Sequence, residues 1–210
     1  MDLRAVVTVG LALAAVTAGC STDRVTTSPD PEPVTEERLS DALLAIDDLP
    51  SGFSEDPAPV TAATEILPEH ACDDRLAGLR PEAEVSRSFQ GGDSRLSSTV
   101  AWFPGAGGAV EQVVRQLASD CSAVVMADRG LAVRTGPLRF GALSDDTVPI
   151  RMEIEGSTGP IQERDMVLVR RGDLVNIIRL EGPRPSDKSL LDLAARLAIG
   201  RLSLLDEQTT

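Results

Sequence analysis

The chain is poor in the residues on which most active sites and nucleic-acid surfaces depend. Its 210 residues include no tyrosine, one tryptophan, four phenylalanines and one histidine, and its formal net charge is −13. An acidic chain with so few aromatic rings lacks both the basic surface and the stacking platforms that bind nucleic acid, so a nucleic-acid partner is excluded. A single histidine also leaves few candidates for a general acid, base or activated nucleophile. We therefore expect a protein that is not an enzyme and holds no cofactor.

The first twenty residues are typical of an export signal. Residues 5–18 form an apolar run of about fourteen residues, which suits a signal-peptide core better than a membrane span. The run ends in Ala18-Gly19-Cys20, which resembles a bacterial lipobox. We expect residues 1–19 to be removed and Cys20 to carry lipid, including palmitate, on the extracytoplasmic face of the cell membrane. An ordinary secretory signal or an uncleaved membrane helix are the alternatives.

The segment after the export signal is acidic and rich in proline. Residues 20–34 contain almost nothing to bury and are expected to form a disordered tether. Residues 21–84 hold 16 acidic side chains against 4 arginines, whereas residues 85–210 hold 16 against 15 basic ones. Most of the negative charge therefore lies near the membrane anchor. One folded domain is expected over residues 35–205, and residues 206–210 are expected to fray.

Two adjacent apolar strands, within residues 165–180, are expected at the centre of this domain. Two runs rich in β-branched residues meet at Gly172-Asp173, a pair that favours a tight two-residue turn. The turn sets a register in which Leu168 lies opposite Ile177. One face then carries Met166, Leu168, Val175 and Ile177, and the other carries Val167, Val169, Leu174 and Ile178. Because both faces are apolar, we expect helices to cover both.

The remaining segments predict a mixed α/β (α+β) domain. Residues 147–155 alternate between apolar and polar, so we expect a flanking strand with one buried face and one exposed face, on which Arg151 tolerates a charge reversal. Further strands are expected over residues 84–89, 95–103 and 131–140, the last interrupted at Gly136-Pro137. Helices are expected over 35–48, capped by Thr35, over 109–118, and after a cap at Ser186. This arrangement is an α/β/α sandwich around a mainly antiparallel sheet.

The cysteines left after lipidation are best explained as a disulfide. Export places Cys72 and Cys121 in an oxidising compartment, where they are the available pair. A zinc site formed by His70, Cys72 and Cys121 is the alternative, but it lacks a fourth ligand. We therefore expect the disulfide and no metal.

Other motifs fit catalysis or ligand binding poorly. The glycine-rich residues 104–110 lie where a dinucleotide loop would lie, but Val110 occupies the third glycine position. Ser157 lies one residue out of step with a nucleophile elbow, and a serine–histidine pair would have to use His70. Arg171-Gly172-Asp173 spells an adhesion tripeptide that a hairpin turn explains equally well. Acidic pairs without calcium-loop spacing fit turns and caps, namely Asp47-Asp48, Asp73-Asp74 and Asp145-Asp146.

Several soft motifs together resemble a known family. They are Leu49-Pro-Ser-Gly-Phe53, an Ala-rich helix ending at Cys121, the run from Phe140 to Thr147, and the pattern from Asp165 to Gly172. In this order they resemble the PknH-like extracellular sensor domains of actinobacteria, over about residues 36–205. The resemblance implies a PsbP-like α/β/α sandwich, found in lipoproteins and in the outer part of receptor kinases. It implies no particular ligand residues.

Two classes of function remain after these exclusions. The first is a non-enzymatic, sensor-like module of the cell envelope that binds a small envelope molecule or a protein. The second is a carrier of lipid or glycolipid, which would need a large apolar cavity. An envelope hydrolase is a remote third option. The ligand-binding residues cannot be assigned from sequence.

Overall fold

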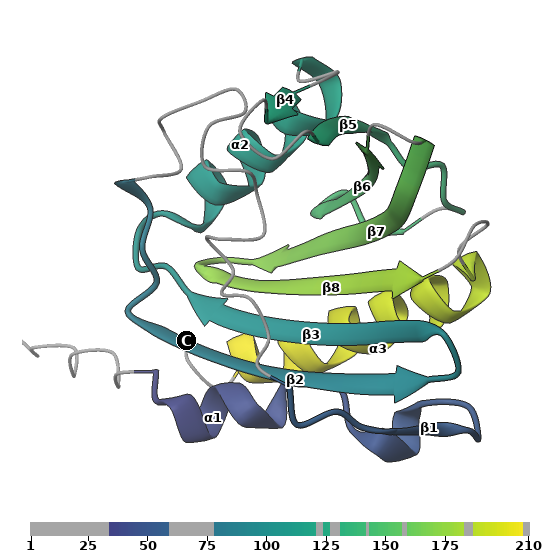
Figure 1. Cartoon of the computed structure of the whole chain (residues 1–210). Coiled ribbons are helices and arrows are strands. Elements are labelled where there is room, and N and C mark those ends of the chain that lie inside the picture. Colours follow the sequence, from purple (N-terminus) through teal and green to yellow (C-terminus); the bar gives the residue numbers. More distant parts are fainter. Residues whose placement is uncertain are drawn as a thin grey trace, which may run out of the picture. The chain divides into compact units, whose positions relative to one another are not determined.

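The computed structural model describes residues 34–58, 78–120, 124–126, 131–141, 143–156, 159–182 and 187–207. They form an eight-stranded sheet in the order β1-β2-β3-β8-β7-β6-β5-β4, in which every neighbouring pair is antiparallel (Figure 1). The strands are β1 (Phe53–Glu55), β2 (Ala83–Gly91), β3 (Ser94–Trp102), β4 (Val124–Met126), β5 (Leu131–Pro137), β6 (Thr147–Gly156), β7 (Gly159–Arg171) and β8 (Leu174–Gly182). The helices are α1 (Glu36–Asp41), η1 (Ile46–Asp48), α2 (Gly107–Asp120) and α3 (Lys188–Glu207).

The predicted central hairpin is confirmed in both its turn and its register. Arg171 pairs with Leu174 across a two-residue turn, and Leu168 pairs with Ile177. Gly172 has a φ of 53°, a left-handed conformation that glycine adopts without a steric penalty. The hairpin strands β7 and β8 lie in the middle of the strand order. The local pattern of β-branched residues and turn therefore defines the centre of the sheet.

Helices cover both faces of the sheet, which confirms the predicted sandwich. On one face, which we call the α3 face, α1 and α3 pack over Val167, Val169 and Ile178, and Figure 1 shows α3 running behind β3 and β8. On the other face, which we call the α2 face, α2 packs over Leu168 and Ile177. Each face has a separate apolar core because side chains alternate along a strand.

The flanking strand β6 differs from its prediction on one face. Its apolar side chains Val148, Ile150 and Met152 are buried in the α2 core, as expected. The opposite face is half-buried and not freely exposed. Arg151 on that face pairs with Asp165 of β7, whose side chain is fully buried. The predicted exposure of this face is therefore wrong, and with it the reason to expect that Arg151 tolerates charge reversal.

The first predicted helix stops earlier than its apolar spacing suggests. Thr35 caps α1 as predicted, but α1 ends at Asp41, and only the short turn η1 follows. The carbonyl groups that would continue the helix accept hydrogen bonds from distant side chains. Ala42 O accepts from Asn176, Leu43 O from Arg201 and Leu44 O from Arg87. These bonds satisfy carbonyl groups that have no partner within a helix, and Leu43 and Leu44 pack into the core.

Three further boundaries also differ. β5 ends at Pro137, so of the two strand pieces predicted on either side of Gly136-Pro137 only the first is a strand, and residues 138–140 lie outside it. The carboxylate of Asp187 accepts from the amides of Ser189 and Leu190 at the start of α3, while the predicted cap Ser186 lies outside the described residues. α3 continues through Glu207, beyond the predicted start of fraying. β1 and β4, each of three residues, were not predicted.

Candidate functional site

The α2 face has an apolar half and a polar half, and the strand register separates them. Under α2, the side chains of β6 and β7 are apolar. Towards β2, the same face changes character, because Ser88, Ser97 and Arg179 are successive cross-strand partners on β2, β3 and β8. All three are at most 3% exposed. A row of buried polar side chains at the centre of a sheet is costly unless its members are paired, and so it is a candidate site.

The next row of the polar half holds two arginines around a single carboxylate. Glu181 of β8 is the cross-strand partner of both Arg95 and Arg164. Arg164 Nε lies 2.7 Å from Glu181 Oε1, and Arg179 Nε lies 3.2 Å from the same oxygen. Arg95 instead pairs with Asp56, at 2.7 Å. We call Arg95, Arg164 and Arg179 the arginine cluster.

Arg179 is the most deeply buried member of the cluster. It is 2% exposed, and among the residues that the structure describes, neither its Nε nor its Nη1 has a hydrogen-bond partner. Burial lowers the pKa of Arg179, and Arg164 and Arg95 lower it further, whereas Glu181 raises it. The guanidinium group nonetheless stays charged at neutral pH, because an unperturbed arginine titrates far above it. The site therefore holds a buried cation with unused donors.

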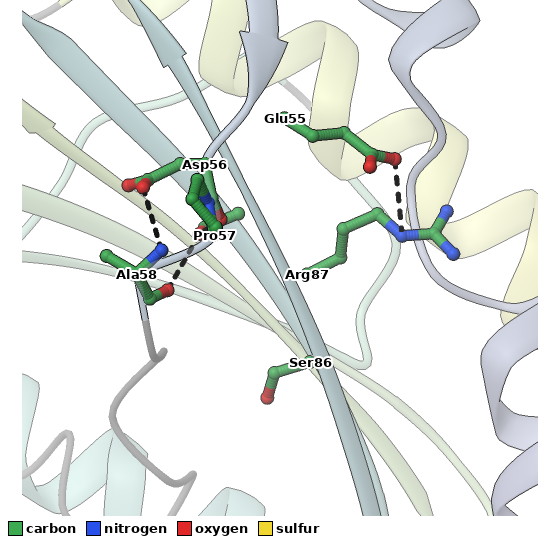
Figure 2. Close-up of a pocket in the computed structure, with 7 residues that line it drawn as sticks. Glu55, Asp56, Pro57, Ala58, Ser86 and Arg87 are labelled. Carbon is green, nitrogen blue, oxygen red and sulfur yellow. Dashed lines mark hydrogen bonds and ion pairs between the residues drawn. The ribbon is translucent and has the colours of Figure 1, made fainter.

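A pocket of about 540 Å³ opens at the edge of this polar half, between β1 and β2 (Figure 2). Five of its seven lining residues are polar or charged, and the lining comprises Glu55, Asp56, Pro57, Ala58, Ser86, Arg87 and Ser88. Ser88 Oγ donates to Asp56 O at 3.0 Å, and Arg95 Nη2 donates to Ala58 O at 2.9 Å. Arg95 thus joins the wall of the pocket to the arginine cluster.

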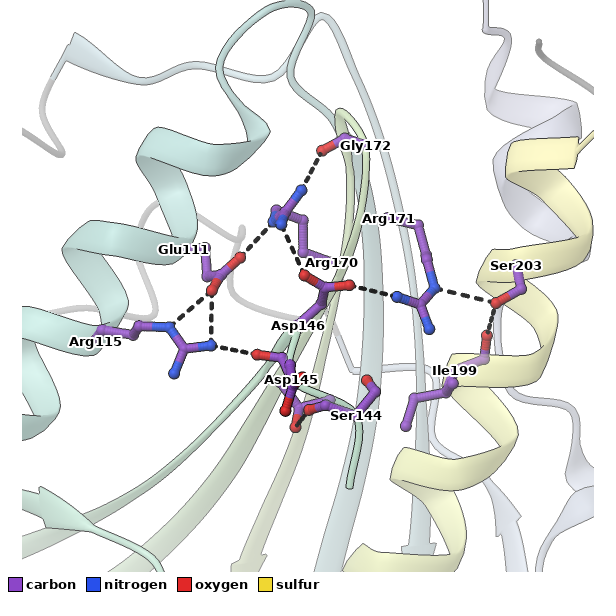
Figure 3. A network of polar contacts seen from close by, with 11 residues as sticks. Glu111, Arg115, Ser144, Asp145, Asp146, Arg170, Arg171, Gly172, Ile199 and Ser203 are labelled. Carbon is purple, nitrogen blue, oxygen red and sulfur yellow. Dashed lines mark hydrogen bonds and ion pairs between the residues drawn. The ribbon is translucent and has the colours of Figure 1, made fainter. Parts of the chain in front are cut away.

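A second polar network lies at the hairpin end of the sheet and has a structural role (Figure 3). Arg170 donates to Glu111 of α2 and, at 2.8 Å, to Asp146. Arg171 donates to the other oxygen of Asp146 at 2.5 Å and to Ser203 of α3 at 3.2 Å. Adjacent residues of a strand point to opposite faces, so one carboxylate at the rim connects α2 with α3. All these groups are bound to one another, which leaves little capacity for a ligand.

Glu111 is the carboxylate in this network whose ionisation is most clearly perturbed. Burial raises its pKa, but hydrogen bonds from Arg170 and Arg115 lower it by more, so its pKa lies below the usual range. The bond from Arg115 Nε measures 2.7 Å. Glu111 is therefore ionised at neutral pH and holds α2 to the hairpin.

The glycine-rich loop of residues 104–110 does not form a phosphate site. The carboxylate of Asp173 accepts from the amide of Gly105 at 2.6 Å and from that of Gly107 at 3.4 Å. The amides that a phosphate would use are thus bound by a side chain of the β7–β8 turn. Arg171 and Asp173 of the adhesion-like tripeptide are both engaged in these internal contacts, which is consistent with the turn interpretation.

Most of the residues that the sequence singled out lie outside the described residues. These are Cys20, His70, Cys72, Cys121 and Ser157. In the described part of the chain, no group of three or more His, Cys, Asp or Glu side chains is placed to hold a metal ion. The same part contains no helix that is long and apolar enough to cross a membrane. Of the acidic pairs, Asp48 binds Arg201 and Asp146 binds two arginines, while Asp73-Asp74 falls outside the described ranges.

The position of Arg179 in its strand is a sequence feature that points to the site, although it belongs to no motif. In β8, Arg179 shares its face with Val175 and Ile177, both buried in the α2 core. A charged residue in phase with an apolar face of a doubly covered strand is unusual and points to a bound partner. The involvement of Arg95, Arg164 and Asp56 was not readable, because strand order decides which residues meet.

The fold and the site define a class of α/β/α sandwich domain whose antiparallel sheet carries a polar half-face with a pocket at its edge. No family model and no curated protein matches the chain. Several solved structures match it in fold. The extracellular domain of PknH from Mycobacterium tuberculosis matches 84% of this chain and 99% of its own length, with 17% identity and a TM-score of 0.57. This confirms, at the level of fold, the resemblance expected from the sequence.

Two further structural likenesses are too weak to bear on the fold or the function. An uncharacterised Mycobacterium smegmatis protein matches 76% of this chain and 92% of its own, with 13% identity and a TM-score of 0.44. A STAR-related lipid transfer protein from Xanthomonas axonopodis matches 63% of this chain and 97% of its own, with 13% identity and a TM-score of 0.26. The fold is therefore assigned from the PknH domain alone.

Proposed function

We propose that the chain is a recognition module of the cell envelope, which binds a small envelope molecule or a protein and has no catalysis of its own. The observation that carries this proposal is the polar half of the α2 face, with a pocket of about 540 Å³ at its edge. Pockets with a few convergent polar groups are the usual binding sites of proteins. The fold shared with the extracellular domain of PknH supports the same function by analogy.

The proposed location is the extracytoplasmic face of the membrane, with Cys20 as the lipid anchor. Support comes from the apolar run before Cys20 and from the acidic, proline-rich segment after it. Such a segment holds a folded domain away from an anionic bilayer surface, where it can meet a ligand or a partner protein. Cys20→Ala is expected to release the protein from the membrane fraction and to abolish its labelling by fatty acid. Unchanged fractionation and labelling would contradict the anchor.

The polarity of the pocket favours recognition of a polar ligand over transport of lipid. An acyl chain needs an apolar cavity, whereas this pocket is lined by Glu55, Asp56, Arg87 and two serines. The apolar side chains on both faces of the sheet are instead used in packing α1, α2 and α3. We therefore rank the carrier below the recognition module.

Native mass spectrometry of the full chain, purified from its own envelope in detergent, tests the proposal. A copurified polar molecule or protein at stoichiometric amounts is the expected result. Stoichiometric phospholipid or glycolipid would instead establish the carrier. An esterase, phosphatase or peptidase activity that Ser157→Ala or His70→Ala abolishes without unfolding the protein would overturn the non-catalytic assignment.

A further inference from the structure

Arg179 has a charge that its surroundings only partly neutralise. Its side chain is 3% exposed, and its contact with Glu181 is an ion pair at 3.2 Å without hydrogen-bond geometry at Nε. Among the described residues, Nη1 also has no acceptor. Buried donors almost always have partners, and a buried charge without full pairing is costly. A buried guanidinium group with unpaired donors is therefore a candidate for binding a ligand.

The neighbouring charges leave room for one more anion. Glu181 is shared between Arg164 and Arg179, and its second oxygen already accepts from Gln162 Nε2 at 3.1 Å. Asp56, the other carboxylate at the cluster, is committed to Arg95. Among the described residues, the ion pairs of the arginine cluster join three guanidinium groups to two carboxylates, in a chain whose net charge is −13.

We propose that the Arg179 guanidinium binds an oxyanion group, a carboxylate or a phosphate, of the ligand that the recognition module takes up. This inference rests on the proposed function and specifies the chemical class of its ligand. A guanidinium group offers a planar pair of donors that matches both oxyanions. Nη1, which has no acceptor among the described residues, supplies one donor of this kind.

The pocket at the strand edge and Arg179 lie at the two ends of one cross-strand row. Ser88 lines the pocket, Ser97 is its partner on β3, and Arg179 is the next partner on β8. Because neighbouring strands lie about 4.8 Å apart, the backbone of Arg179 lies about 10 Å from that of Ser88. In this proposal the body of a small polar acid occupies the pocket and its anionic group is directed along the row towards Arg179. The Ser88 hydroxyl is not one of its donors, because it already donates to Asp56 O.

Anion titrations of the full chain in detergent micelles test the proposal. Thermal unfolding and calorimetry are recorded at pH 7 with sodium phosphate or sodium acetate replacing sodium chloride at constant ionic strength. We expect saturable binding and a rise in Tm with at least one of the two oxyanions. Phosphate alone would indicate a phosphorylated ligand, and acetate alone a carboxylic acid. An equal response to all three salts would reflect only screening and would overturn the proposal.

Substitutions separate binding from a structural role. Arg179→Met is expected to weaken oxyanion binding at least about tenfold, which corresponds to one charge-assisted hydrogen bond, and to leave the Tm without oxyanion unchanged or higher. A purely structural Arg179 predicts the reverse, namely a lower Tm with the anion response retained, and that result would overturn the proposal. Arg196→Met is the control, because Arg196 is an exposed arginine of α3 paired with Asp192.

A second variant covers the case in which Arg179→Met does not fold. Arg179→Lys keeps the charge but loses the planar fork, so we expect binding at least about threefold weaker than in the unaltered protein. Unchanged affinity in Arg179→Lys would overturn the role of the guanidinium group. Absence of any oxyanion binding in the unaltered protein, together with a neutral copurified ligand, would overturn the anion site while leaving the recognition function intact.

Discussion

Arg151 and Asp165 form a two-bond ion pair across β6 and β7, with Arg151 Nε and Nη2 donating to the two carboxylate oxygens at 2.8 and 2.7 Å. Asp165 is fully buried, and the buried Glu163 lies 3.0 Å from Arg151 Nη2. The hydrogen bond from Arg151 to Asp165 raises the pKa of Arg151, so Arg151 is charged at neutral pH. A strand that reads as half-exposed therefore carries a buried charge pair on its polar face.

Arg151→Asp is expected to destabilise the protein severely, by about 3–5 kcal/mol, because it removes one member of a buried ion pair and adds a like charge. Urea unfolding at pH 7 measures the effect. Arg134→Asp is the control, since Arg134 is a 58% exposed arginine on the neighbouring strand, and its loss should cost about 1 kcal/mol or less. Similar costs for the two variants would contradict the burial of the Arg151–Asp165 pair.

Charges introduced on either face of the central hairpin should be equally damaging. Val169 faces α3 and Ile177 faces α2, and both are at most 5% exposed. Val169→Asp and Ile177→Asp should each cost several kcal/mol out of a total of about 5–15 kcal/mol. Leu204→Asp is the matched control, because Leu204 is 62% exposed. Tolerance of a charge at one hairpin position alone would mean that only one face is covered, which would contradict the sandwich.

Gly107 and Gly108 are adjacent in α2 but should respond to alanine in opposite directions. A Cβ at Gly107 would collide with Gly172 O and lie 2.8 Å from Asp173 Cα, whereas a Cβ at Gly108 would meet no atom within 4 Å. Gly107→Ala should therefore push α2 from the hairpin and cost roughly 2 kcal/mol. Gly108→Ala should stabilise by about 0.5–1 kcal/mol, because alanine favours the helix. Thermal unfolding of both variants, compared with the unaltered protein, decides whether the hairpin turn packs against α2 as described.

The contact between α2 and the hairpin should weaken in acid. The pKa of Glu111 is lower in the folded protein than its ordinary value, so its contribution to stability is complete above that value, near 4.5, and is lost as the pH falls through the folded-state pKa. Glu111→Gln should lower stability at neutral pH by about 1–3 kcal/mol and have a smaller effect below pH 4. Urea unfolding at several pH values measures this difference. A cost that is independent of pH would indicate that Glu111 acts through packing and not through its charge.

The proposed Cys72–Cys121 disulfide should leave no free thiol in the lipidated chain. Closing a loop of about fifty residues contributes about 4 kcal/mol in the chain-entropy model, so a reducing agent should lower the unfolding temperature markedly. Thiol titration under denaturing, non-reducing conditions is the measurement. Two titratable thiols per chain would exclude the disulfide and favour the zinc alternative with His70.

Short-range patterns in the sequence were sufficient to predict the centre of the fold. The turn at Gly172-Asp173 and the apolar alternation on each side fix the pairing of Leu168 with Ile177, because both act between residues close in the chain. The same reasoning predicted helices on both faces, since apolar side chains on two faces need two covers. The export signal and the acidic tether are likewise predictions from local composition.

Contacts between distant residues decided what the local patterns could not. The first helix ends early because Ala42, Leu43 and Leu44 offer their carbonyl groups to Asn176, Arg201 and Arg87, which lie 134, 158 and 43 residues away. Helical spacing contains no information about such acceptors. The end of the first helix therefore could not be predicted from the sequence of that segment alone.

Contacts between distant residues also determine which side chains meet at the candidate site. The sequence determines that Arg179 is in phase with the apolar face of β8, but strand order alone brings it beside Ser97 and places Glu181 between Arg95 and Arg164. Whether a buried guanidinium group has enough acceptors depends on every neighbour in three dimensions, because hydrogen bonds are satisfied by proximity in space and not along the chain. Local sequence therefore determined the central hairpin, and the tertiary structure decided which charged side chains of the sheet lie together.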